Sequence, residues 1–194
     1  MSHGHPSSDS QATVSIPDLV QRLRAVNHTL PEALQAQILT AGSAIVPDLL
    51  TILEATLADD ETDHGWTPSH AAKLLGQLGG AQAVPVLLSF LEHYDVLDAY
   101  QQDAEDALVA VGSLAIEVCL EAYPSASQED LRKGIVAVLS HSAEKDERIY
   151  QTLLDFFEQS TELGAIYLAE YGDPRALPAL SQMFDALPVN DQDD

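Results

Sequence analysis

The sequence predicts an all-α fold built as a stack of short helical hairpins, and three observations predict it. Leu and Ala dominate the apolar residues, which make up 46% of the chain, whereas aromatic residues make up only 6%. Apolar residues recur at spacings of three and four, which is the period of a helix that buries one face. A short phrase built around glycine and proline returns along the chain, and such internal repeats are typical of stacked helical units.

The repeated phrase is an apolar helical face, a glycine, a small gap, an Ala or branched residue, usually a proline, and then paired apolar residues. It occurs at Ile38–Leu50, Leu74–Leu88, Leu108–Leu120 and Tyr167–Leu180. Its glycines, Gly42, Gly79, Gly112 and Gly172, are separated by 37, 33 and 60 residues. The last interval spans two units, and Gly134–Leu154 supplies the missing unit without a glycine at its turn.

The stretch GDPRALPAL, which begins at Gly172, shows why the phrase predicts a turn between two helices. Gly172 is expected to end the first helix, because a left-handed backbone conformation costs other residues energy. Asp173 is expected to cap the second helix, and Pro174 and Pro178 fall in or near its first turn, where a missing N–H costs little. One pair of helices cannot bury its apolar face alone, so the units are expected to stack.

Taken in order, the pattern predicts one capping helix followed by five hairpins. The expected helices are Ile16–Asn27, Pro31–Ala41, Ala44–Leu57, Pro68–Leu78, Ala81–His93, Val96–Val111, Leu114–Ala122, Gln128–His141, Glu144–Gln159, Glu162–Tyr171 and Pro174–Ala186. The polar residues 1–15 and the acidic residues 188–194 are expected to be disordered tails that flank a repeat domain spanning residues 16–187.

The phrases GDPRALPAL and LLGQLGGAQAVPVLL resemble the short HEAT repeats of the phycobilin-lyase (PBS lyase) type. The resemblance covers most of residues 30–187 and implies a right-handed α-solenoid of about five HEAT-like hairpins with an N-terminal capping helix. The fourth unit departs from the pattern, because it lacks Gly and Pro at its turn. Proteins with similar repeats include bilin lyases, phycobilisome-degradation factors, an iron-dependent hydroxylase, DNA alkylation-repair glycosylases and many interaction scaffolds.

The charge of the chain limits its partners. Its 31 acidic and 8 basic residues give a formal net charge of −23. Such a surface repels nucleic acids and anionic membranes, and favours basic or neutral protein surfaces or metal ions. High solubility or a high-salt proteome would also explain the charge. The single cysteine excludes a disulfide framework, and no signal peptide or membrane span is recognisable, so a cytoplasmic protein is expected.

No catalytic, cofactor or metal site is predicted. None of the seven histidines is followed by Glu, although the di-iron hydroxylase of this fold class uses His-Glu dipeptides. The acidic loop Leu57–Trp66 fails as a calcium-binding EF-hand, because Gly65 is seventh from Asp59 and the twelfth residue is His70 rather than Glu. His64 and His70 are interpreted as polar surface residues rather than as metal ligands with Asp63. Cys119 lies on an apolar helical face and is expected to be a buried structural thiol.

Two features are candidates for partner recognition. Trp66 precedes a helix start at Thr67 and either packs back on that helix or forms an exposed anchor. The tract Leu91–Leu108 mixes acidic residues with tyrosines, which suits either a basic peptide or a solvated helix face with packing tyrosines. In arrays that this one resembles, the second helices line the concave side. The candidate partner-binding residues are Trp66, Glu92, Tyr94, Asp98, Tyr100, Glu117, Glu121, Glu147, Gln151 and Asp155.

Three hypotheses of function follow. The first is a non-enzymatic scaffold or adaptor whose acidic concave surface binds a basic or neutral protein partner. The second, implied only by the resemblance, is a bilin lyase or a bilin-handling factor. The third is a DNA mimic that occupies the binding site of a nucleic-acid-binding protein. This hypothesis is suggested by the net charge of −23. The sequence identifies neither the partner nor the oligomeric state.

Overall fold

The computed structural model describes residues 14–186 except 60, 61, 63, 79, 96 and 97. Within these residues the chain is entirely helical, as predicted, with eleven α-helices and no strand. The tails expected at 1–15 and 188–194 lie, apart from residues 14 and 15, outside the described residues. The α-helices are α1 (Ile16–Arg24), α2 (Glu32–Ala41), α3 (Val46–Ala58), α4 (Thr67–Leu78), α5 (Val84–His93), α6 (Ala99–Val111), α7 (Ser113–Ala122), α8 (Glu129–Ser140), α9 (Glu147–Gln159), α10 (Thr161–Tyr171) and α11 (Leu177–Ala186).

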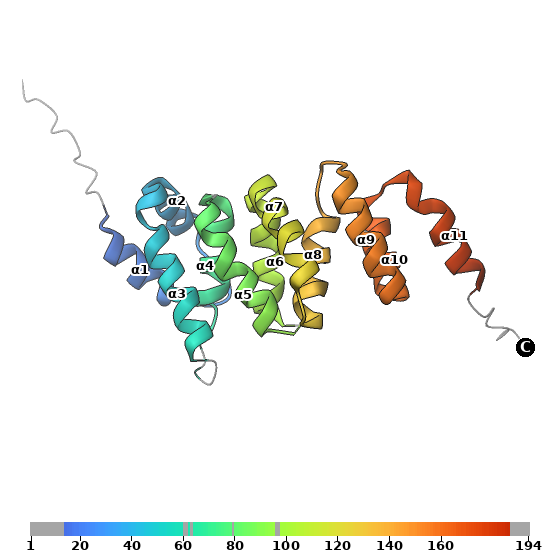
Figure 1. Ribbon diagram of the computed structural model, residues 1–194. Coiled ribbons are helices and arrows are strands. Elements are labelled where there is room, and N and C mark those ends of the chain that lie inside the picture. The colour runs from blue at the N-terminus through green and yellow to red at the C-terminus, as the bar shows by residue number, and fades with distance from the viewer. Residues whose placement is uncertain (1–13, 60–61, 63, 79, 96–97, 187–194) are drawn as a thin grey trace, which may run out of the picture.

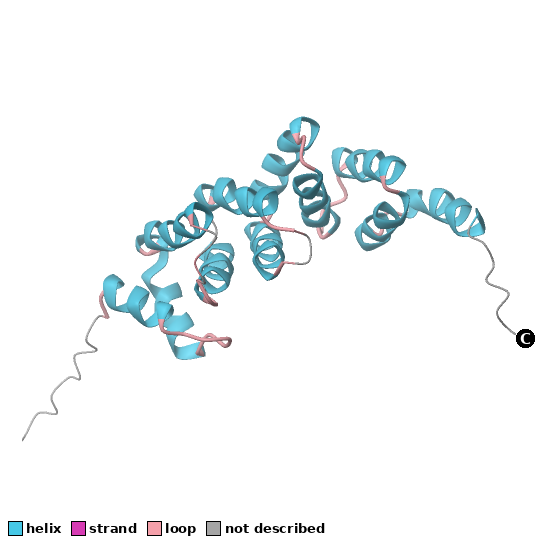
Figure 2. Cartoon of the chain, turned by 90° about the horizontal axis from the view of Figure 1, so that it is seen from below, coloured by secondary structure: helices cyan, strands magenta, loops and turns pink. Residues whose placement is uncertain are grey.

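The helices form a single elongated row, with α1 at one end and α11 at the other (Figure 1). Seen from below, the row is bowed (Figure 2). Successive even-numbered helices contact one another, α2 with α4, α4 with α6, α6 with α8 and α8 with α10. Among the odd-numbered helices, α3 contacts α5 and α7 contacts α9. Residues far apart in the sequence are therefore brought together by neighbouring units, and α6, α8 and α10 share one side of the stack.

The turn at Gly172 has the predicted construction. Gly172 lies in the left-handed region, with φ 66° and ψ 32°, and ends α10. The Asp173 carboxylate accepts a hydrogen bond of 3.0 Å from the Arg175 N–H, and Pro174 begins a 3₁₀ turn that leads into α11. Gly42 and Gly112 also have positive φ values, of 61° and 77°. The fourth glycine of the repeated phrase, at position 79, lies outside the described residues.

The turns at Gly42 and Gly112 are corners rather than tight hairpins. The chain bends by 101° between the helical segments Glu32–Ala44 and Val46–Ala58, and by 119° between Ala99–Val111 and Ser113–Ser125. The extensive contacts between consecutive helices lie instead across the other connections, where α3 packs on α4, α5 on α6, and α9 on α10. A hairpin centred on each glycine is thus an incomplete description, because the helix pairs that pack most closely are joined by the glycine-free loops or by the acidic loop 59–66.

The fourth unit uses its glycine for packing rather than for its turn. Gly134 lies inside α8, where an added Cβ atom would come within 3.1 Å of Leu91 and 3.2 Å of the Gln101 amide. The turn from α8 to α9 is held by other means. Asp146 caps α9 by accepting a hydrogen bond of 2.7 Å from the Arg148 N–H, and the buried Tyr171 hydroxyl accepts one of 2.8 Å from the Asp146 N–H.

Close helix contact and leucine packing make the core. An added Cβ at Gly76 would lie 2.8 Å from the Ala107 Cα, so α4 and α6 touch backbone to backbone there. Fully buried aliphatic side chains continue along the row, and burial of each contributes about 1.5–3 kcal/mol; they include Leu23, Ile38, Leu53, Leu74, Leu91, Leu108, Ile135, Ile149 and Leu168. Cys119 is also fully buried, as predicted, and burial raises the pKa of its thiol to about 12.

No single described helix is long and apolar enough to cross a membrane. Two pairs of helical segments are long and apolar enough only when both segments are counted together, and each pair is sharply bent at the break. They are Glu32–Ala44 with Val46–Ala58, and Ala99–Val111 with Ser113–Ser125.

Candidate functional site

The predicted aromatic residues lie around the loop before α4 but make separate ring contacts. The side chain of Trp66 is 41% exposed, and its ring meets the edge of His28 at a centroid distance of 4.6 Å. Tyr94 and Tyr100 are half-buried, with ring centroids 5.3 Å apart, and the Tyr100 hydroxyl donates a hydrogen bond of 2.8 Å to the Gly65 carbonyl. The tyrosines therefore fasten the loop before α4 to α5 and α6, and Trp66 remains partly open to solvent.

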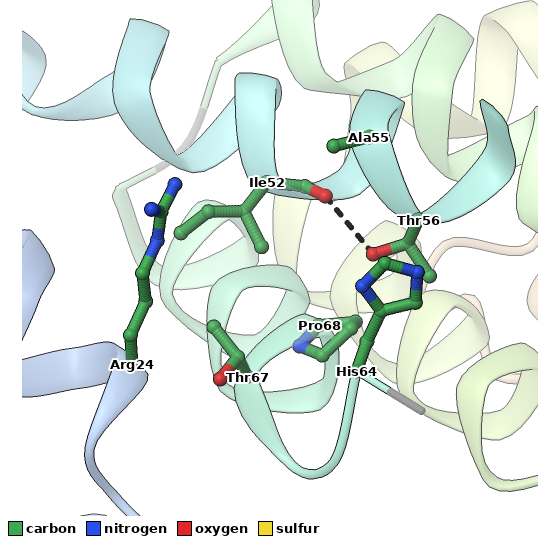
Figure 3. A pocket seen from close by; sticks show the side chains of 7 residues that line it. All are labelled: Arg24, Ile52, Ala55, Thr56, His64, Thr67 and Pro68. Carbon is green, nitrogen blue, oxygen red and sulfur yellow. Dashed lines mark hydrogen bonds between the residues drawn. The ribbon is translucent and has the colours of Figure 1, made fainter. Parts of the chain in front are cut away.

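A pocket of about 300 Å³ lies between α1, α3 and the start of α4 (Figure 3). Ile52, Ala55 and Pro68 supply apolar lining, and Arg24 and His64 stand on either side of it. The His64 Nε2 lies 2.6 Å from the Asp59 carbonyl, so this ring holds its own loop in place.

His70 differs from the expectation of a surface residue. It is only 4% exposed, and its Nε2 lies 2.7 Å from the carbonyl of Asn27 in the α1–α2 connection. The cause is the contact of α4 with α1 and α2, which covers the first turn of α4. His70 therefore ties two helical units together.

Most of the predicted acidic residues make bonds between units. Arg148 on α9 holds Glu117 on α7 through two hydrogen bonds, of 2.7 and 2.8 Å. Arg175 pairs with Glu147, and the Arg132 guanidinium lies 3.4 Å from the Asp155 carboxylate. The remaining predicted residues have the following places: Gln151 donates to Glu147, Glu92 accepts from Gln128, Asp98 caps α6, and Glu121 is exposed on α7.

The predicted residues thus form two groups rather than one site. Trp66, Tyr94, Asp98 and Tyr100 lie around the start of α4 and of α6, whereas Glu117, Glu147, Gln151 and Asp155 lie on α7 and α9. Arginine side chains already occupy three carboxylates of the second group. Those carboxylates connect the units of the stack, and a partner would have to compete with these arginines to bind them.

A third group, which the sequence did not predict as a site, lies on α6, α8 and α10. We call it the α6–α8–α10 cluster, and it consists of Gln101, Glu105, Ser140, His141, Tyr167 and Glu170. The Gln101 Nε2 donates a hydrogen bond of 3.3 Å to Glu105. The Ser140 hydroxyl lies 2.8 Å from the Ala137 carbonyl and 3.2 Å from the Glu170 carboxylate.

Burial and negative charge act together on this cluster. The half-buried Glu105 has its pKa raised from 4.5 to about 7, chiefly by burial and then by Asp106, with Glu170 adding to the effect. His141 and the Gln101 hydrogen bond act in the opposite direction. The pKa of Tyr167 is raised to about 12 by its burial and by the charges of Glu105 and Glu170. The cluster is therefore rich in acceptors and carries an unfavourable negative charge.

The serine and histidine of the cluster are not arranged as a nucleophile with its base. The His141 Nδ1 lies 3.3 Å from the Ser140 hydroxyl but 2.8 Å from the Ala137 carbonyl. A carbonyl only accepts hydrogen bonds, so Nδ1 carries the proton in that contact and cannot take one from Ser140. Among the described residues no group of three or more His, Cys, Asp or Glu side chains could hold a metal ion.

Three helices that are distant in the sequence contribute to the cluster, which explains why the sequence did not predict it. Glu105 belongs to the acidic tract that the sequence analysis identified, but nothing local connects it to His141 or Glu170. The one local signal is the spacing of Gln101 and Glu105, four residues apart on a helix whose neighbouring Ala104 and Leu108 are buried.

Comparison with known proteins shows that one unit of the stack is similar to a family of helical repeats. Residues 69–93 match the family model described as "PBS lyase HEAT-like repeat". They comprise most of α4, the connection after it and α5. This segment is similar to a PBS lyase HEAT-like repeat. The resemblance read from LLGQLGGAQAVPVLL is confirmed, since that phrase lies within the matched HEAT-like repeat. No curated protein and no solved structure matches the chain.

Proposed function

We propose that this chain is a non-enzymatic protein-binding scaffold, a right-handed α-solenoid of about five HEAT-like units whose acidic surface takes a basic or neutral protein partner. The observation that supports it most is the use of the basic residues. All eight lie within the described residues, and every one except Arg24 has an intramolecular carboxylate or carbonyl partner. Nearly all the basic side chains are therefore engaged within the fold. Because the chain has 31 acidic and only 8 basic residues, many carboxylates have no basic partner.

Several exposed carboxylates on the second helices have no ion-pair partner among the described residues. They are Glu54, Glu121, Glu158 and Asp185. Exposed apolar side chains accompany them in the second half of the row, where Leu114 is 56%, Leu177 62% and Phe184 74% exposed. A surface that combines unpaired acids with apolar side chains suits a partner that offers Lys or Arg around an apolar contact.

The proposal is tested by affinity capture from an extract of the native organism at 50 and 500 mM salt, with partners identified by mass spectrometry. We expect one or a few protein partners, bound less at the higher salt, because surface charges are screened within about 8 Å at physiological ionic strength. The matched variant replaces Glu54, Glu121 and Glu158 by Gln and should lose part of the bound partner. Capture that is unaffected by salt and by these substitutions would contradict an acidic binding surface.

A second function, handling of a bilin, is favoured only by the family description of residues 69–93. It predicts that the purified chain shifts the absorption spectrum of a free bilin or transfers it to an acceptor protein. An unchanged spectrum at saturating bilin would exclude it. Capture of a nucleic-acid-binding protein that added DNA displaces would instead support the DNA-mimic hypothesis.

A further inference from the structure

We propose that the α6–α8–α10 cluster is the binding site for a cationic side chain, lysine or arginine, of the protein partner. The inference rests on the proposed scaffold function and gives it a specific contact. Three observations support it: a buried acceptor without a donor, two carboxylates without a cation, and apolar side chains placed beside them.

The buried acceptor is the side-chain oxygen of Gln101. Gln101 is fully buried, and its Oε1 has no hydrogen-bond partner among the described residues. Its amide nitrogen donates to Glu105, so the amide group lies directly at that carboxylate. A buried acceptor that lacks a donor is costly, so an added donor at this position would be favourable. A cation bound at Glu105 would therefore also lie beside this polar amide group.

The nearby lysines are already engaged. Lys133 on α8 pairs with Glu129 at 2.7 Å and with Asp130 at 3.5 Å, both on its own helix. Lys73 on α4 pairs with Asp103 at 2.8 Å. Glu105 and Glu170 therefore have no ion-pair partner among the described residues, although His141 interacts with Glu105 electrostatically. A cation that pairs with these carboxylates would therefore come from outside the chain.

Exposed apolar side chains near the cluster could contact the methylene groups of a bound lysine or arginine. Val109, one turn after Glu105 on the same face of α6, is 36% exposed. Ile166, one turn before Glu170 on α10, is 52% exposed. Lysine and arginine lay their methylene groups on apolar surface while the charged end reaches acceptors. The cluster thus offers carboxylates for the charged end of such a side chain and apolar surface for its methylene groups.

A cationic side chain fits the cluster better than a metal ion does. The described residues contain no metal-binding group of three or more ligands, and the Nδ1 of His141 is occupied by the Ala137 carbonyl. The available atoms are carboxylate, amide and hydroxyl oxygens on three helices, and an ammonium or guanidinium group can donate to several of them at once.

The test measures binding of short peptides by isothermal titration at pH 7.5 and low salt. The probes are a Gly-Ser peptide with three lysines, its arginine counterpart and its acetyl-lysine counterpart. We expect the lysine or the arginine peptide to bind, and the acetylated peptide to bind at least about tenfold more weakly. Equal binding of the acetylated peptide would overturn the proposal.

Two variants distinguish binding of the peptide at this cluster from its general attraction to a negatively charged protein. Glu105→Gln should weaken binding about tenfold, whereas Glu32→Gln, with the same change of charge at an exposed position in the first turn of α2, should change it less than about twofold. Carboxyl-carbon NMR supplies a second readout on the unaltered protein: saturating peptide should move the titration of Glu105 to lower pH. If both variants bind equally well and the titration does not move, the site is wrong while the scaffold stands. If affinity capture also yields no partner, the scaffold itself fails.

Discussion

Arg148 on α9 binds Glu117 on α7 in a two-pronged contact, with guanidinium-to-carboxylate distances of 2.7 and 2.8 Å. The same guanidinium lies 2.6 Å from Asp146, the cap of its own helix. Arg175 repeats the arrangement one unit further on, where it pairs with Asp173 and Glu147. In both cases an arginine two residues after a capping aspartate reaches back to the preceding unit. These arginines therefore fix the orientation of neighbouring units in the second half of the row.

The first prediction concerns the loss of the contact between Arg148 and Glu117. Arg148→Gln should lower the melting temperature by no more than about 3 °C, because both partners are half-exposed and such pairs are weak in water. The hydrogen bonds from Arg148 hold the pKa of Glu117 below its usual value. Their stabilisation is thus present at neutral pH and is lost as the pH falls below about 4. Thermal melts at pH 7 and pH 3 measure it.

Arg24→Gln is the control for that experiment, because Arg24 has no ion-pair partner among the described residues and loses the same charge. Equal effects of the two substitutions at pH 7 would mean that the contact with Glu117 contributes nothing. Arg148→Lys should fall between the unaltered protein and Arg148→Gln, since an ammonium cannot match both carboxylate oxygens as a guanidinium does.

Local signals predicted the helices well. All eleven were expected, and their ends agree closely where proline or glycine marks them. The exceptions have physical reasons: Ala81–His93 was predicted as one helix but begins as a 3₁₀ turn, with Pro85 in the first turn of the α-helix that follows. The sites could not be predicted in this way. Pairs such as Glu117 with Arg148, and the meeting of Glu105 with Glu170, depend on how units stack, which no local pattern specifies.

The second prediction concerns the corner at Gly172. Gly172→Ala should destabilise the protein by about 1 kcal/mol, because alanine is unfavourable at φ 66°. The cost is conformational rather than steric, since the nearest atoms to an added Cβ lie 3.8 Å away. Gly80→Ala is the control, because Gly80 is extended with φ −152° and should accept alanine without loss. Urea unfolding of the two variants measures the difference, and equal midpoints would refute the role of the left-handed turn.

The third prediction removes the hydroxyl that holds the α8–α9 turn. The Tyr171 hydroxyl accepts a hydrogen bond from the Asp146 N–H and lies 3.1 Å from the Glu144 carbonyl, to which it can donate. Tyr171→Phe leaves both groups without this partner and should cost about 1–2 kcal/mol. Tyr150→Phe is the matched change, because the Tyr150 side chain is similarly buried but makes no hydrogen bond to the described residues. Amide hydrogen exchange at Asp146 should quicken in the first variant alone.

The last prediction follows from the charge at Glu105. Its pKa is raised from 4.5 to about 7 by burial and by neighbouring carboxylates, so the folded chain holds a proton there that the unfolded chain releases. The stability that this proton brings is present below pH 4.5 and is lost as the pH rises through 7. Glu105→Gln keeps a neutral side chain at every pH. It should therefore match the unaltered protein at pH 4.5 and exceed its stability by about 1–2 kcal/mol at pH 8, after allowance for partial exposure.

Urea unfolding at pH 4.5, 6 and 8 follows this difference directly. Glu158→Gln, which removes the same charge from an exposed position, should show little change of stability over that range. The difference between Glu105→Gln and the unaltered protein should grow with pH and level off above about 7. A difference that is constant with pH would mean that Glu105 is ionised throughout. Its carboxylate would then already have a stabilising partner, and the need for a cation from outside would disappear.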